Sequence, residues 1–213
     1  QFLQKSKAIA TVVERQPRLI FAIDATASRQ PTWDSACHLQ HQMFQATANI
    51  ASLSIQLCYY RGFNDFYASR WLSDSERLGQ VMAGVYCEGG HTQIARLLQH
   101  ALSEQRRGKV RALVFIGDAL EENPDKLCDL AGQCGLLQLP LFLFQEGQDQ
   151  RVQQTFRSMA RLSGGAYASF DANSAHTLAA LLGAVASYVA GGRAALENTT
   201  GDSAKLLLKQ LKP

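Results

Sequence analysis

Apolar and polar positions alternate along the chain in two distinct patterns. Five short, mostly apolar segments have the length and the β-branched and aromatic content of buried strands. They lie at residues 19–23, 54–60, 110–116, 139–144 and 166–170. Because segments with helical spacing separate most of them, the pattern predicts a mostly parallel sheet with helices on both faces. A sixth segment, residues 65–73, follows the second after a short turn, which predicts an antiparallel strand at the sheet edge.

Capping residues and helical spacing predict the helices. Residues 74–83 begin with polar side chains that can cap free amides, and residues 175–189 stop at Gly191 and Gly192. Further helices are predicted at residues 33–49, 92–106, 124–135 and 149–162. Together these elements predict a doubly wound, three-layer α/β fold.

The chain divides into three predicted regions. These are a helical extension at residues 1–17, the α/β domain at residues 18–190, and a C-terminal tail at residues 191–213. The tail contains a short amphipathic stretch at residues 204–212. Its spacing is compatible with a helix that docks on the protein and also with a frayed helix at the surface.

Composition narrows the class of protein. The 213 residues are 46% hydrophobic, which suffices for one buried core. No run of eighteen apolar residues and no signal-like N-terminus occurs, so we expect a soluble, cytoplasmic protein without a membrane span. The net charge is only +3, and the basic residues form only one small cluster. A nucleic-acid-binding surface is usually larger, which argues against a nucleic-acid partner. The five cysteines form no Cys-x-x-Cys pair, which favours reduced thiols.

Two of the predicted strands end in an acidic residue, Asp24 and Asp118. In an open parallel sheet, ligands bind beyond the carboxyl ends of the strands, where these carboxylates would meet. A divalent cation would relieve their repulsion. Alternate side chains of an extended loop point the same way, so Thr26 and Ser28 can converge on the same point as Asp24.

Thr92 adds a third oxygen-bearing segment, at a predicted helix start after Gly89 and Gly90. Carboxylates and hydroxyls are hard donors, which suit Mg²⁺, Mn²⁺ or Ca²⁺ better than Zn²⁺. Mg²⁺ usually keeps waters or accepts a ligand from outside the protein. The sequence therefore predicts a magnesium site whose ligands bind directly or through water: Asp24, Thr26, Ser28, Thr92 and Asp118.

These residues resemble the metal-ion-dependent adhesion site of the von Willebrand factor type A (VWA) domain. The family pattern is Asp-x-Ser-x-Ser, then a Thr, then an Asp, and Thr26 keeps the hydroxyl of the first Ser. The resemblance covers roughly residues 18–190, including the order of elements and the edge hairpin. It implies a VWA-type, Rossmann-like fold. The lack of a signal-like N-terminus and the reduced-thiol cysteine pattern favour an intracellular, bacterial member of the family.

The chain departs from the family pattern at two places. His91 stands between the two glycines and Thr92, where it could lie at the rim of the site. Asp118 is followed by Ala-Leu-Glu-Glu instead of glycine. We expect Glu121 and Glu122 to be solvated acids before the helix at residue 124 and not metal ligands.

Two other groups of side chains have simpler interpretations. Cys37, His38 and His41 lack the fourth ligand of a zinc site, so we take them as ordinary helix residues. Aromatic residues around the hairpin are expected to pack in the core or across strands, and any that are exposed are interface candidates. They are Tyr59, Tyr60, Phe63, Phe66, Tyr67 and Trp71.

In VWA domains the metal usually captures a carboxylate of a partner protein. The resemblance therefore implies a non-enzymatic interaction module whose partner supplies a Glu or Asp, with the oligomeric state left open.

The chain contains no phosphate-binding glycine loop. The enzymatic alternative is a Mg²⁺-dependent phosphoryl-transfer hydrolase of the haloacid dehalogenase type with Asp24 as nucleophile, although such phosphatases carry an Asp where this chain has Thr26. The third interpretation of the chain is a scaffold domain that binds no metal.

Overall fold

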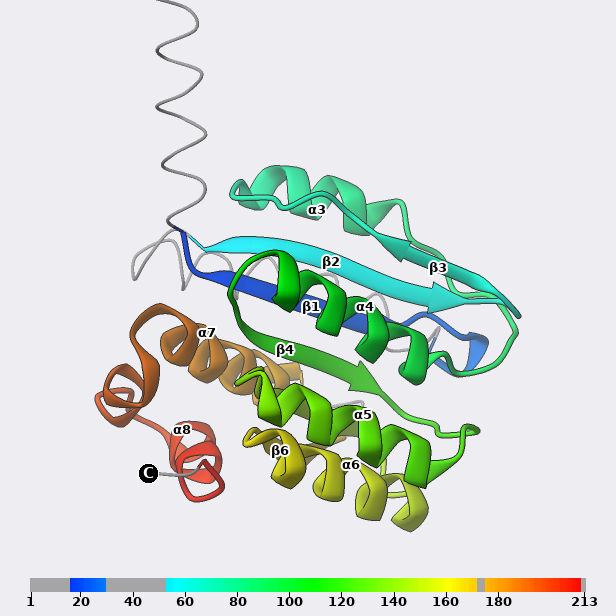
Figure 1. The fold of residues 1–213 in the computed structure, drawn as a ribbon. Helices are drawn as coiled ribbons and strands as arrows, with labels where there is room; N and C mark the ends of the chain where they lie inside the picture. Colours follow the sequence, from blue (N-terminus) through cyan, green and yellow to red (C-terminus); the bar gives the residue numbers. More distant parts are fainter. Residues whose placement is uncertain (1–15, 30–52, 172–174, 212–213) are drawn as a thin grey trace, which may run out of the picture.

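The computed structural model describes residues 16–29, 53–171 and 175–211 (Figure 1). Six strands form one sheet in the order β3-β2-β1-β4-β5-β6. They are β1 (Arg18–Asp24), β2 (Ser54–Arg61), β3 (Asp65–Ala68), β4 (Val110–Gly117), β5 (Leu141–Glu146) and β6 (Ala166–Phe170). Neighbouring strands are parallel except β2 and β3, which are antiparallel. The predicted sheet with one antiparallel edge strand is confirmed.

Helices cover both faces of this sheet (Figure 1). One face packs against α4 (Ile94–Arg107), α5 (Pro124–Leu136) and α6 (Gln150–Ser163). The other face packs against α3 (Ser75–Ala83), α7 (Ala175–Glu197) and α8 (Asp202–Leu208). Each face has its own hydrophobic cluster, so the three-layer α/β class is confirmed.

The central strand β1 is buried on both sides. Its Phe21 and Ile23 belong to the cluster under α7, whereas Ile20 and Ala22 belong to the cluster under α4 and α5. Side chains of a strand alternate between faces, so a strand covered on both sides has to be apolar throughout. This explains the uninterrupted apolar run that ends at Asp24.

Most predicted helix starts agree with the structure within two residues. The side chains of Asp74, Asn123 and Asp149 accept hydrogen bonds from backbone N–H groups in the first turns of α3, α5 and α6. The predicted helix at residues 33–49 lies outside the described residues, as does the predicted extension up to residue 15.

Helix α7 extends further than predicted. Gly192 leaves the helical conformation at φ 69° and ψ −160°, as the predicted stop requires, but helical turns resume and α7 ends at Glu197. The following helix, α8, buries Ala204 and Leu207 in the cluster under α7. Of the two interpretations of the tail, the docked helix is therefore the one observed.

Helix α7 is long and apolar enough to cross a membrane by length and composition alone. Its side chains Leu181, Val185 and Val189 are buried against the sheet. Packing in the core therefore accounts for its apolar composition.

Candidate functional site

The candidate site lies at the carboxyl ends of β1 and β4, the two central strands. From β1 the chain crosses to β2 on one side, and β4 pairs with β1 on the other, so the strand order reverses here. Ile23 pairs with Ile116, which brings Asp24 and the residues after β4 to the same edge. Such a reversal point is where open α/β sheets bind ligands.

Asp24 is fully buried at the end of β1. One carboxylate oxygen accepts a 2.8 Å hydrogen bond from the N–H of Thr26, and the other accepts one of 3.0 Å from the Tyr60 hydroxyl. Burial, with a smaller contribution from the nearby charge of Asp118, raises the pKa of Asp24 to about 6 despite the lowering effect of the hydrogen bonds from Thr26 and Tyr60. The two acids are thus close enough to repel one another.

The two hydroxyls after Asp24 lie close together. Thr26 is buried, Ser28 is in the short helix η1 (Ala27–Arg29), and their side-chain oxygens are 3.3 Å apart. The hydrogen bond from the Thr26 N–H to the Asp24 carboxylate folds the loop back on the strand end. The loop therefore places the Thr26 and Ser28 hydroxyls next to one another and joins Thr26 to Asp24 through its backbone N–H.

Thr92 is joined to the loop that follows Asp118. Its hydroxyl accepts a 3.2 Å hydrogen bond from the N–H of Glu121, and its own N–H donates one of 2.9 Å to the Glu121 carboxylate. Among the hydrogen bonds of the described residues, none joins Thr92 to the loop at residues 24–28. The structure therefore links Thr92 to the β4 side of the site.

Asp118 has one buried carboxylate oxygen, Oδ1, that accepts no hydrogen bond from the described residues. A buried oxygen of this kind is costly unless a ligand or water satisfies it. The residue Asp118 also lines a cavity of about 630 Å³, and the other lining residues include three acidic ones, Glu146, Asp149 and Asp171. Both observations favour a cation at this end of the sheet.

A close contact between Gly90 and Gly62 fixes the loop that carries Thr92. A Cβ atom on Gly90 would lie 1.8 Å from the carbonyl oxygen of Gly62, so only glycine permits this approach. The N–H of His91 donates a 3.1 Å hydrogen bond to the same carbonyl, and the Glu88 N–H donates one of 3.0 Å to the carbonyl of Ala25. The loop is thereby fastened to the hairpin and to the Asp24 loop.

The acids after Asp118 hold the start of α4. The Glu122 carboxylate accepts hydrogen bonds of 2.6 Å and 2.8 Å from the N–H groups of Ile94 and Ala95. Free amides at a helix N-terminus bind anions well. The expectation that Glu122 is merely solvated is therefore wrong, because the start of α4 lies within its reach.

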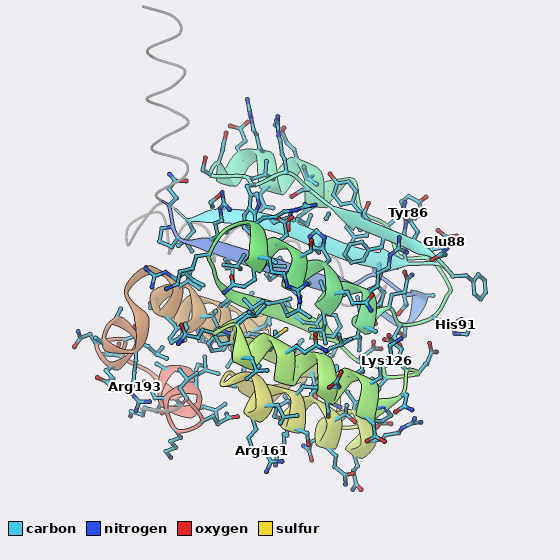
Figure 2. The ribbon with its side chains drawn as sticks, viewed as in Figure 1. Tyr86, Glu88, His91, Lys126, Arg161 and Arg193 are labelled. Carbon is cyan, nitrogen blue, oxygen red and sulfur yellow. The ribbon has the colours of Figure 1, made fainter. Side chains whose placement is uncertain are left out.

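Exposed side chains surround the edge of the site. Figure 2 shows Tyr86, Glu88 and His91 on the side of the molecule where the strands end. Phe63 is 76% exposed and contacts the His91 ring edge to face at 5.2 Å. Tyr86 is 57% exposed, and the Arg61 guanidinium lies 3.9 Å from its ring centre. Phe63 is thus one of the hairpin aromatics that qualifies as an interface candidate, and Tyr86 joins it.

The residues present fit a hard cation. Two carboxylates from adjacent strand ends and a pair of hydroxyls supply oxygen donors, and one of the carboxylate oxygens has no hydrogen-bond partner among the described residues. In residues 16–29, 53–171 and 175–211, no three His, Cys, Asp or Glu side chains group closely enough to bind a metal by themselves. A metal here would therefore depend on the hydroxyls and on ligands from outside the chain.

Tyr60 is a residue of this site that the sequence does not reveal, because the pattern around it predicts a packing aromatic. The available signal was its position: Tyr60 ends the apolar run of β2 as Asp24 ends that of β1. The observed register pairs the two residues directly.

No family model and no curated protein matches this chain. Solved structures do match it. The VWA domain of SpRpn10 is 13% identical with a TM-score of 0.61, over 76% of this chain and 95% of that one. Human COPII-coat protein Sec24c is 11% identical with a TM-score of 0.57, over 82% and 32%. The pilus adhesin SpaC of Lactobacillus rhamnosus GG is 8% identical with a TM-score of 0.61, over 82% and 30%.

These likenesses establish the fold. The chain has the VWA-type, Rossmann-like α/β fold that its motif and order of elements predict. It spans about a third of the length of the coat protein and of the adhesin.

Proposed function

We propose that the chain is a protein-interaction module of the VWA type that binds its partner through Mg²⁺. Asp24, Thr26, Ser28, Thr92 and Asp118 would hold the ion directly or through water, and Mn²⁺ or Ca²⁺ could replace it. The observation that carries the proposal is the buried, unsatisfied oxygen of Asp118 beside the buried carboxylate of Asp24. When bound, the ion would supply an open coordination position for a carboxylate of the partner.

The charges around the site explain why the ion would be required. An acidic side chain approaching Asp118 would meet the carboxylates of Asp118, Glu146, Asp149 and Asp171. Like charges at close range are unfavourable, so a cation between them would favour the binding of a partner's Glu or Asp. The fold neighbours include a pilus adhesin and a coat protein, which is in keeping with a binding role.

The phosphohydrolase alternative requires Asp24 to attack a phosphorus atom. Both oxygens of its carboxylate accept hydrogen bonds, from the Thr26 N–H and the Tyr60 hydroxyl, which reduces its nucleophilicity. Position 26, where such phosphatases carry an acid, is a buried threonine. These features favour the binding role over hydrolysis.

Water-proton relaxation of the Mn²⁺-loaded protein tests the carboxylate step. N-acetylglutamate amide is expected to displace an inner-sphere water and lower the relaxivity, whereas the neutral N-acetylglutamine amide should leave it unchanged. Equal effects of the two compounds would contradict carboxylate capture. Hydrolysis of an aryl phosphate that is abolished by Asp24→Asn would favour the enzyme instead.

A further inference from the structure

Strand β6 forms one margin of the sheet. There the side chain of Gln210 makes hydrogen bonds that a neighbouring strand would otherwise make. The Gln210 side chain accepts a 3.0 Å hydrogen bond from the Tyr167 N–H and donates one of 2.9 Å to the Tyr167 carbonyl. These are the two bonds that a residue of an added strand would make. The segment after α8 thus covers a single residue of this edge.

Ser169 lies two residues further along β6, and its peptide group faces the same outer side. Peptide groups in a strand alternate in direction, and the carbonyl of Phe170 accepts a hydrogen bond from Gly147 on the β5 side. Because β6 is the last strand of the described sheet, no strand covers Ser169. Its N–H and C=O can therefore pair with an incoming backbone.

A cavity of about 550 Å³ runs along this edge. Arg157 and Arg161 line it from α6, and Leu206 and Gln210 line it from α8 and the segment that follows. Figure 2 shows Arg161 at the outer margin of α6. Among the described residues, no carboxylate lines the cavity and neither arginine forms an ion pair.

The two sides of the cavity differ in chemistry. The Arg157 guanidinium lies 5.2 Å from the centre of the Tyr167 ring, on the face of the sheet that α6 covers. Leu206, which is 45% exposed, lies on α8, which packs on the opposite face. Side chains of a strand alternate between faces, so a strand added here would present every second residue to the arginines and the others to Leu206.

We propose that the outer edge of β6 binds an extended segment of a partner protein in which acidic residues alternate with apolar ones. The segment adds a strand to the sheet by pairing with Ser169, its acids face Arg157 and Arg161, and its apolar residues pack on Leu206. This site uses none of the proposed metal ligands, so its binding is independent of Mg²⁺.

Fluorescence anisotropy with a labelled, end-blocked decapeptide of alternating valine and glutamate tests this proposal. We expect it to bind at least tenfold more tightly than the matched valine and lysine peptide, in EDTA as in Mg²⁺. The double variant Arg157→Glu/Arg161→Glu should reverse this preference. Arg151→Glu, on the same helix but outside the cavity, should leave it unchanged.

The variant Ser169→Pro tests the backbone pairing separately. Proline removes only an N–H that faces outward, which edge strands tolerate, so the fold is kept while the peptide affinity falls at least tenfold. Circular dichroism melting verifies that each variant is folded. Unchanged affinity in folded Ser169→Pro, equal binding of the two peptides, or absence of acidic-peptide binding to the wild type would overturn the proposal. Edge-to-edge dimers that Ser169→Pro dissolves would also overturn it, in favour of a second copy of the chain.

Discussion

The hydroxyl of Tyr60 donates a 3.0 Å hydrogen bond to the buried carboxylate of Asp24, and so joins the ends of two adjacent strands. This bond stabilises the charged form of Asp24, whereas burial opposes it. The balance between burial and hydrogen bonding sets the pKa of Asp24. This pKa affects both the stability of the metal-free protein and the pH at which a cation can bind.

Replacement of Tyr60 by phenylalanine should destabilise the protein at pH 7 by about 1–3 kcal/mol, because a buried carboxylate loses a donor. It should also raise the pKa of Asp24. Urea unfolding in EDTA measures the free energy. Tyr86→Phe, at an exposed tyrosine, is the matched control and should change stability by less than about 0.5 kcal/mol. Equal effects of the two changes would show that the Tyr60 hydroxyl does not matter to Asp24.

Asp24→Asn should make the metal-free protein more stable at neutral pH. The pKa of Asp24 is raised from an ordinary value near 3.8 to about 6, so the folded state binds the proton more tightly than the unfolded state. Stability contributed by this group is present below pH about 4 and is lost as pH rises toward 6. The variant lacks this loss, and its advantage should reach about 1–3 kcal/mol above pH 6.

Urea unfolding of both proteins in EDTA, at several pH values between 4 and 7, measures this difference. A difference that does not change with pH would contradict the raised pKa. Since the proton competes with the ion, Mg²⁺ affinity of the wild type is expected to weaken below pH about 6.

Gly90→Ala should destabilise the protein by about 1–3 kcal/mol and weaken metal binding, because its Cβ would overlap the Gly62 carbonyl. Gly89→Ala is the matched control, since a Cβ there meets nothing within 4 Å. Thermal melting and Mg²⁺ titration report the two effects. Similar behaviour of the neighbouring variants would argue that the Gly62 contact does not position Thr92.

Glu122→Ala should cost about 1–2 kcal/mol, because two amides at the start of α4 lose their charged acceptor. Asp129→Ala, at an exposed carboxylate on α5, should change stability by less than about 0.5 kcal/mol. Denaturant midpoints of the two variants provide the comparison. A shift no larger than that of Asp129→Ala would mean that the cap is not used in solution.

Local patterns were sufficient to predict most of the sheet and the helix starts. The apolar run before Asp24 could be recognised because β1 is buried on both faces. Asp74 and Asp149 could be recognised as helix caps because each accepts a hydrogen bond from a residue only two or three positions later. The meeting of the Asp24 and Asp118 loops followed from the expected parallel order of the strands.

The remaining features depend on contacts between distant segments. The pairing of Tyr60 with Asp24 needs the register of β1 against β2, and the role of Glu122 needs the position of α4. The approach of Gly62 to Gly90 cannot be read from either glycine alone. The continuation of α7 past Gly192 is set by packing of Leu196 in the core, which local breaker residues do not reveal.

Isothermal titration calorimetry with Mg²⁺ tests the central claim most directly. We predict that the wild type binds one ion per chain saturably, that Asp118→Ala loses this binding and that Asp129→Ala keeps it. Melting curves in EDTA verify that both variants are folded. The claim would be contradicted by a wild-type chain that binds no divalent ion at neutral pH, or by a folded Asp118→Ala variant that binds Mg²⁺ as the wild type does.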